Sequence, residues 1–389
     1  MEQQLPDVQR FLQAVTEVEQ DNANQVLDLL REKRIPCGYF YPFADMLEQI
    51  QYMPMLEEQG LQIAVICNLN PQLAAEAREK YGRDIVSLRE FQEQSRQIGV
   101  MIMHPLLNLG AYGRIFEAMQ LPTLFLGSAD SSAACKETFF DHLPEIYAAY
   151  ADFHDDDSRA AFLGGWRGRI TARWSQFHFA PEPQYLLAGF MPQAGDIAID
   201  GGAYDGGTSA MFASLGAEVY AFEMDAKNYQ KCQARAEAGH FTVENLGLSD
   251  RPKEASYNSS GTGSSLKEEG SDIAHCTSID AYVEQKQLPR VDYIKLDVEG
   301  AELDTLHGAV QTIAKWKPRL AISAYHKDED IYRLQAYIKS IRPDYEFAFR
   351  HYEIDVHDYW LSDGEKAAMR EYNLGESVPT PCEMILYAR

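Results

Sequence analysis

Four ionisable side chains stand where short apolar runs of this sequence end, and their types suit ligand binding and proton transfer. They are Asp200, Glu223, Asp297 and His326. In an open parallel sheet the carboxyl ends of the strands share one edge, where ligands bind. One such residue alone would be a helix cap or a surface group, but four that share an edge predict a functional site.

A glycine-rich loop, DGGAYDGG at 200–207, follows the first of these runs. Glycine lets the backbone turn tightly and lets a ligand approach it closely. The dinucleotide fingerprint GxGxxG is not met, because Ala203 and Tyr204 stand where spaced glycines are needed. A pyrophosphate needs that bare backbone, whereas S-adenosylmethionine has no phosphate. Glu223 lies about twenty residues farther on, where a carboxylate accepts ribose hydroxyls. We predict these cofactor-binding residues: Asp200, Gly201, Gly202, Ala203, Tyr204, Glu223, Met224, Leu248, Ser249 and Asp297.

The second anchor is VDYIKLDVEGAE at 291–302. Lys295 lies inside the predicted strand, where an unpaired charge is costly, so we expect it to pair with a carboxylate at the sheet edge. Histidine titrates near neutral pH, and we predict that His326 takes the proton of an acceptor hydroxyl. Asp297 then helps to hold the cofactor or the acceptor. The predicted catalytic residues are His326, Asp297, Glu299 and Lys295.

Two alternatives stay open at this edge of the sheet. His326 could be only a hydrogen-bonded strand end, in which case Asp297 or Glu299 would be the base. We predict no metal site, because Asp297 and Glu299 offer fewer oxygen ligands than hard-ion sites usually have.

The elements that must position these residues form an alternating α/β pattern. In the first third, strands are predicted at Cys37–Tyr41, Leu61–Cys67, Gly99–Met103 and Thr123–Leu126, with helices at Gln72–Tyr81 and Ala111–Met119. We predict a Rossmann-like accessory domain at 1–130, a helical connector at 131–185 and a catalytic domain at 186–389. The accessory domain has no glycine fingerprint, so we expect it to be dispensable for cofactor binding.

The last half of the chain contains three further elements of note. The polar segment Tyr257–Ser271 is interpreted as a lid over the nucleotide site or as a flexible linker. One helix is predicted from Gly300, with Leu303, Leu306, Val310 and Ile313 on one face. A closing strand at Glu383–Ala388 is predicted to run antiparallel.

The composition limits the function further. The 389 residues carry a formal charge of -24, which disfavours nucleic acids and anionic lipids as partners. The six cysteines show no CxxC pair, and no apolar run is long enough to span a membrane. Since the N-terminus also lacks a signal peptide pattern, we expect a cytoplasmic protein.

From about residue 156 to the C-terminus, the sequence resembles the FkbM family of S-adenosylmethionine-dependent methyltransferases. The resemblance lies in DGGAYDG at 200–206, Phe222-Glu223, KLDVEGAE at 295–302 and AYHK at 324–327. It implies a seven-stranded Rossmann-like α/β sheet, preceded here by a smaller α/β domain. It also implies S-adenosyl-L-methionine as cofactor and methylation of a hydroxyl on a sugar, glycan or related small molecule.

Two alternative functions are weighed against this one. A nicotinamide-dependent sugar-modifying oxidoreductase should show GxGxxG, and neither half of the chain does. A non-catalytic binding protein on the same fold would not need the full set of charged residues at the sheet edge. The acceptor, the choice between O- and N-methylation, metal dependence and homo-oligomerisation cannot be inferred from the sequence.

Overall fold

A computed structural model describes residues 5–20, 31–34, 36–40, 57–58, 60–68, 78–79, 82, 85–87, 90, 100–103, 120–121, 123–125, 132–258, 265–267, 270, 272–355 and 379–389. The chain divides into two compact units. The first comprises Met1–Tyr147, Ala160–Phe179 and His351–Cys382, and the second Ala148–Arg159, Ala180–Arg350 and Glu383–Arg389. The predicted division into 1–130, 131–185 and 186–389 stays a prediction.

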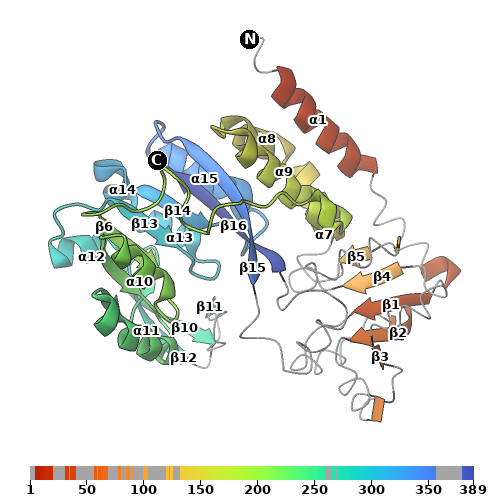
Figure 1. The fold of residues 1–389 in the computed structure, drawn as a ribbon, viewed down its shortest axis with the longest axis horizontal. Coiled ribbons are helices and arrows are strands. Elements are labelled where there is room, and N and C mark those ends of the chain that lie inside the picture. The colour runs from red at the N-terminus through yellow and green to blue at the C-terminus, as the bar shows by residue number, and fades with distance from the viewer. Residues whose placement is uncertain are drawn as a thin grey trace. The chain divides into compact units, whose positions relative to one another are not determined.

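The first unit contains a five-stranded parallel sheet of order β3-β2-β1-β4-β5 (Figure 1). Its strands are β1 (Pro36–Phe40), β2 (Gln62–Asn68), β3 (Ile85–Ser87), β4 (Val100–Met103) and β5 (Thr123–Phe125). The four strands predicted here are confirmed. The three-residue β3 was missed, and the two predicted helices lie almost wholly outside the described residues.

The helices whose bounds the structure describes before the seven-stranded sheet are α1 (Leu5–Gln20), α7 (Ser132–Asp141), α8 (Leu143–Asp152) and α9 (Asp156–Thr171); a 3-10 turn, η3, follows at Trp174–Gln176. Within the first unit, aromatic side chains join three of these helices. Phe139 packs on Phe11 and edge-on against Trp166, at ring-centroid distances of 6.5 and 5.5 Å. All three side chains are buried, which makes them the apolar core of this helical part.

The second unit is built on a seven-stranded sheet of order β15-β16-β14-β13-β6-β7-β8 (Figure 1). The strands are β6 (Ile197–Gly201), β7 (Glu218–Phe222), β8 (Thr242–Glu244), β13 (Tyr293–Leu296), β14 (Arg319–Ser323), β15 (Phe347–Asp355) and β16 (Pro379–Ala388). Strands β8, β7, β6, β13 and β14 are parallel, and β16 runs antiparallel to β14 as predicted. The predicted seven-stranded α/β fold is therefore confirmed.

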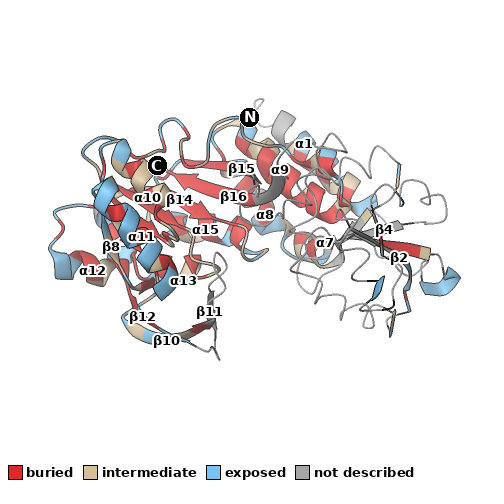
Figure 2. Ribbon diagram, turned by 60° about the horizontal axis from the view of Figure 1, so that its bottom comes forward, coloured by how far each residue is buried: buried red, intermediate tan, exposed pale blue. Residues whose placement is uncertain are grey.

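The strand order reverses beside β6. The chain proceeds from β6 outward to β7 and β8, and then returns to place β13 on the other side of β6. Such a switch point opens a crevice at the carboxyl ends of the two strands, where ligands bind in folds of this type. Both β6 and β13 are buried along their whole length, and β14, red in Figure 2, is buried in all but its first residue.

Six helices accompany this sheet: α10 (Gly207–Ser214), α11 (Ala226–Gly239), α12 (Ile279–Lys286), α13 (Glu302–His307), α14 (Val310–Trp316) and α15 (Asp330–Ile341). The single helix predicted from Gly300 is wrong, since α13 ends at His307 and α14 begins at Val310. The cause is Asp280, whose backbone N–H binds the Gly308 carbonyl and whose carboxylate accepts the backbone N–H groups of Gln311 and Thr312. Capping of this kind starts a new helix.

A third sheet, of order β11-β10-β12-β9, contains β9 (Gly247–Leu248), β10 (Lys253–Asn258), β11 (Ser265–Lys267) and β12 (Asp272–Thr277). Its antiparallel pair β10–β11 occupies part of the segment predicted as a lid or linker. Residues 259–264 between the two strands lie outside the described residues, so the lid stays a prediction.

Candidate active site

The glycine loop after β6 is fixed against both neighbouring strands. Gly202 and Ala203 donate their backbone N–H groups to the Phe222 carbonyl at the end of β7, at 3.0 Å each. Gly202 adopts φ +74°, and a Cβ there would lie 1.7 Å from the backbone oxygen of Asp297 at the end of β13. The loop therefore bridges the switch point, and only glycine fits at position 202.

Lys295 pairs with Asp200 inside the sheet, which confirms the predicted ion pair. Its Nζ lies 3.0 Å from Asp200 Oδ1, and the two side chains are 3% and 0% exposed. The same ammonium donates to the backbone carbonyls of Gly201 and Gly202 at 3.1 and 2.8 Å. Burial alone would lower the pKa of Lys295, but Asp200 and Asp297 outweigh it and raise the pKa. Lys295 therefore holds the loop through two hydrogen bonds to its backbone and one ion pair with Asp200.

Replacing Lys295 with methionine should cost about 3–5 kcal/mol of unfolding free energy, because Asp200 would be left buried and uncompensated. Denaturant unfolding measures this loss. The matched control is Arg333→Met, which removes a half-exposed pair with Glu329 (49% and 48% exposed) and should cost only about 0.3–0.5 kcal/mol. Equal losses in the two variants would show that the buried pair does not stabilise the loop.

Glu223 stands directly after β7 and is 6% exposed. Its Oε2 accepts the backbone N–H of Tyr204 and its Oε1 that of Asp225, both at 2.8 Å. Each oxygen keeps a second acceptor position, so a ribose diol fits beside these bonds. Burial raises the pKa of Glu223 to about 7. Glu223 thus holds the glycine loop, and its two carboxylate oxygens can each accept a further hydrogen bond from a ribose hydroxyl.

The other predicted cofactor residues fall into two groups. Tyr204 is half-buried with Lys231 Nζ 5.1 Å from its ring centroid, and Met224 is half-buried beside it in sequence. Asp200, Leu248 and Ser249 are buried at 0–3% exposure, and the Ser249 hydroxyl binds Asp250. The side chains of this second group are packed inside the protein, and Leu248 forms part of the apolar wall around Gly201.

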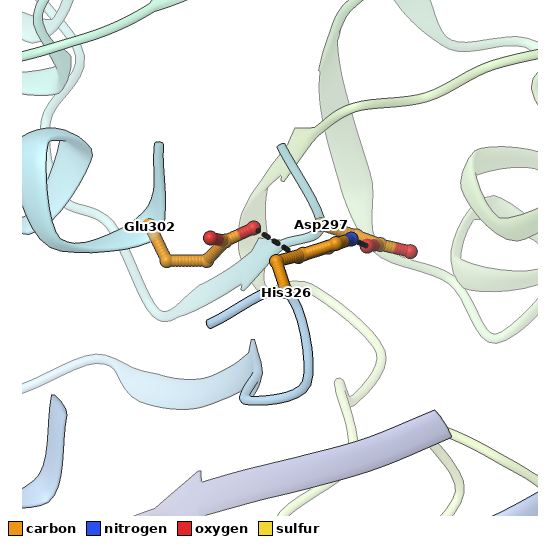
Figure 3. Close-up of side chains that lie close together, drawn as sticks. All are labelled: Asp297, Glu302 and His326. Atoms are coloured by element: carbon orange, nitrogen blue, oxygen red, sulfur yellow. Dashed lines mark ion pairs between the residues drawn. The ribbon is translucent and has the colours of Figure 1, made fainter. Parts of the chain in front are cut away.

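An acidic cluster surrounds His326 at the opposite side of the switch point. His326 Nδ1 lies 3.0 Å from Glu302, and Nε2 lies 3.6 Å from Asp297 and 3.5 Å from Glu299. Figure 3 shows the imidazole between Glu302 and Asp297. Burial alone would lower the pKa of His326, but Glu299 and Glu302 raise it to about 11. An imidazolium cannot accept a proton, so the geometry disfavours His326 as a general base.

A second group of polar side chains contacts Asp297 or the residues bound to it. Tyr325 Oη lies 3.1 Å from Asp297 Oδ1 and 2.9 Å from Glu383 Oε1. Gln184 donates to the other Glu383 oxygen at 2.9 Å, and Tyr185 Oη lies 3.5 Å from Asp297 Oδ2. Burial raises the pKa of Glu383 to about 8. The sequence analysis missed Glu383, Gln184 and Tyr185, although a charged residue at the head of the apolar strand at 383–388 was a usable signal.

Comparison with known proteins identifies the part of the chain that contains the site. Residues 200–360 match the methyltransferase FkbM domain. This chain therefore contains an FkbM methyltransferase domain. The crystal structure of an FkbM methyltransferase from Methylobacillus flagellatus KT has the same fold, with a TM-score of 0.69 and 19% sequence identity over 99% of this chain and 100% of that one.

Other methyltransferase structures match about half of the chain. The precorrin-6y C5,15-methyltransferase of Geobacter metallireducens GS-15 aligns with 54% of this chain and 93% of its own, at 11% identity and a TM-score of 0.33. An rRNA methylase of Streptococcus thermophilus aligns with 51% and 89%, at 13% identity and a TM-score of 0.29. Both scores are too low to support an argument. The search of curated proteins gave no match.

The cofactor of this FkbM methyltransferase is S-adenosylmethionine, and the site fits it. A Cβ on Gly201 would lie 2.8 Å from Leu248 and 3.0 Å from Leu296, so the glycine lets the loop backbone pack closely on an apolar wall. Glu223 supplies acceptors for the ribose at one end, and the partly exposed carboxylates of Asp297 and Glu299 (23% and 29%) supply acceptors at the other.

None of the helices in the described part of the chain has the length and apolarity needed to cross a membrane.

Proposed function

We propose that this FkbM methyltransferase transfers the methyl group of S-adenosylmethionine to a hydroxyl of a sugar, a glycan or a related small molecule. The observation that carries the proposal is the position of Asp297. This carboxylate follows β13 at the switch point, its backbone oxygen touches the glycine loop, and two tyrosine hydroxyls lie within 3.5 Å of it. A partly exposed carboxylate held in this way can orient an acceptor hydroxyl and take its proton.

The bound cofactor supplies an activated methyl group on a sulfonium, so the protein has to align the acceptor and remove its proton. In the proposed reaction the acceptor oxygen forms the new O–C bond, the electrons of the C–S bond return to sulfur, and Asp297 receives the proton. Tyr325 and Tyr185 fix the Asp297 carboxylate in its orientation. We therefore assign the proton acceptor to Asp297 in place of His326.

An acceptor screen tests this proposal. The enzyme is incubated with methyl-labelled S-adenosylmethionine and a panel of free sugars, nucleotide sugars and cell-envelope glycans. Label should enter an alkali-stable methyl ether, and heat-treated enzyme provides the blank. Transfer of label only to amines or only to nucleic acid would contradict the proposed acceptor class.

Cofactor affinity should rise with pH through about 7. Glu223 is neutral below its raised pKa and ionised above it, and the ionised form accepts the ribose hydroxyls more strongly. Calorimetric titration with S-adenosylhomocysteine at pH 6, 7 and 8 measures the trend. Glu223→Gln should bind more weakly and lose this dependence. A wild-type affinity that falls over the same range would contradict the role of Glu223.

A further inference from the structure

The cluster around His326 holds more negative than positive charge. The carboxylates of Asp297, Glu299 and Glu302 all lie within 3.6 Å of the imidazole. Glu302 is 0% exposed, and its Oε2 has no hydrogen-bond partner among the described residues. A buried carboxylate oxygen without a partner is costly, and binding to a cation is one of the few ways to compensate it.

The distances differ on the two sides of the ring. Glu302 Oε1 accepts the backbone N–H of Val298 at 2.9 Å and lies 3.0 Å from His326 Nδ1, so this carboxylate is fixed beside one nitrogen. At the other nitrogen, the separations of 3.6 Å to Asp297 and 3.5 Å to Glu299 exceed an ordinary hydrogen bond of about 2.9 Å. They are close to the separation of about 3.4 Å between two ligands of one tetrahedral ion with bonds of about 2.1 Å.

We propose that Asp297, Glu299 and the Nε2 atom of His326 bind one divalent transition-metal ion, which displaces the Nε2 proton to solvent, with Glu302 orienting the imidazole through Nδ1. A carboxylate on the far nitrogen of a metal-binding histidine is the usual arrangement in proteins, where it fixes the ring and its tautomer. Ligand atoms of Asp297, Glu302 and His326 all lie within 4.8 Å of one another, so Glu302 belongs to the same compact cluster as two of the proposed ligands.

The donor set indicates the kind of ion. One imidazole nitrogen and two carboxylates suit Mn²⁺, Fe²⁺ or Zn²⁺ better than Mg²⁺ or Ca²⁺, which take oxygen ligands. Asp297 and Glu299 are partly exposed, so the ion keeps open positions toward the crevice. An acceptor hydroxyl bound there would lose its proton more easily. This last role rests on the proposed function, whereas binding of the ion does not.

Titration of the chelator-treated protein with Mn²⁺, followed by electron paramagnetic resonance of the free ion, tests the site. We expect one ion per chain. Glu302→Gln should weaken binding by about 10–100-fold, as expected for an orienting carboxylate, and His326→Ala by at least as much. Glu299→Gln removes a partly exposed ligand without burying a new charge, so it tests the site even if the His326 variant fails to fold.

The matched control is Asp304→Asn, on the same helix as Glu302. Asp304 is 60% exposed and should leave Mn²⁺ binding unchanged. Failure of the wild-type protein to bind Mn²⁺ or Zn²⁺, or unchanged binding in Glu299→Gln, would overturn the proposal. So would displacement of the ion by S-adenosylhomocysteine, because the carboxylates would then hold the cofactor's ammonium group. S-adenosylhomocysteine binding to the metal-free protein is measured in parallel, so that failure of the metal site and of the proposed function are distinguished.

Discussion

Substitution of Gly202 by alanine should lower the free energy of unfolding by about 3–5 kcal/mol and abolish cofactor binding. The new Cβ would lie 1.7 Å from the backbone oxygen of Asp297, and it would do so on a residue with φ +74°. Because the clash is with backbone, no side-chain rotation relieves it, and both overpacking and backbone strain contribute. Denaturant unfolding and titration with S-adenosylhomocysteine measure the two effects.

Gly195→Ala is the control for this variant. Gly195 has a similar φ of +85°, but a Cβ there meets nothing within 4 Å. Only the cost of a left-handed conformation remains, about 1–2 kcal/mol, and cofactor binding should persist. If Gly202→Ala and Gly195→Ala were equally stable and bound the cofactor equally well, the contact between the loop and Asp297 would not shape the site.

Asp297→Asn should lower the rate of methyl transfer by about 10²–10⁴-fold, because it removes the proposed proton acceptor while keeping its shape. Asparagine can still bind the Tyr325 hydroxyl, so the network behind the site and the fold should survive. Single-turnover rates with an acceptor from the screen measure the effect, and S-adenosylhomocysteine titration shows whether the cofactor still binds.

Asp304→Asn is again the control, since this exposed carboxylate lies outside the crevice and should leave the rate unchanged. A near-wild-type rate for Asp297→Asn would exclude Asp297 as the proton acceptor. A loss confined to acceptor affinity, with the rate at saturation kept, would reassign it to acceptor binding.

The charged residues at this edge of the sheet were predicted well from the sequence, because a charged residue at the end of a short apolar run is a local pattern. Glu223 and Asp297 directly follow the strands β7 and β13, whereas Asp200 is the penultimate residue of β6, and the three strands are adjacent and parallel. The pairing of Lys295 was predictable for a general reason, since a charge inside a buried strand requires a partner.

Contacts between distant segments were not predictable in this way. Glu383 lies in β16 shortly before Ile385–Ala388, the part that pairs with β14, and because β16 is antiparallel to β14 this position lies at the carboxyl ends of the parallel strands. The antiparallel direction was predicted, but the contact of Glu383 with Tyr325 depends on the register between the strands, which residue types do not reveal. The state of His326 is a similar case, since three carboxylates from another segment, 297–302, set its charge.

The break between α13 and α14 has the same origin. The apolar spacing of 303–313 fits one helix, but Asp280 from a distant segment caps a new one at Val310. Val310 is consequently 37% exposed, although the pattern placed it on the buried face. Local pattern predicts where helices form, whereas tertiary capping decides where they end.

Calorimetric titration of the intact protein with S-adenosylmethionine, S-adenosylhomocysteine and NAD tests the central claim most directly. The loop backbone of Gly201 and Gly202 and the carboxylate of Glu223 should bind both sulfur compounds, and Glu223→Ala should weaken that binding. NAD should not bind, because Ala203 and Tyr204 occupy the positions that its pyrophosphate requires. Binding of NAD as tightly as S-adenosylmethionine, or a Glu223→Ala variant with unchanged affinity, would contradict this account of the site.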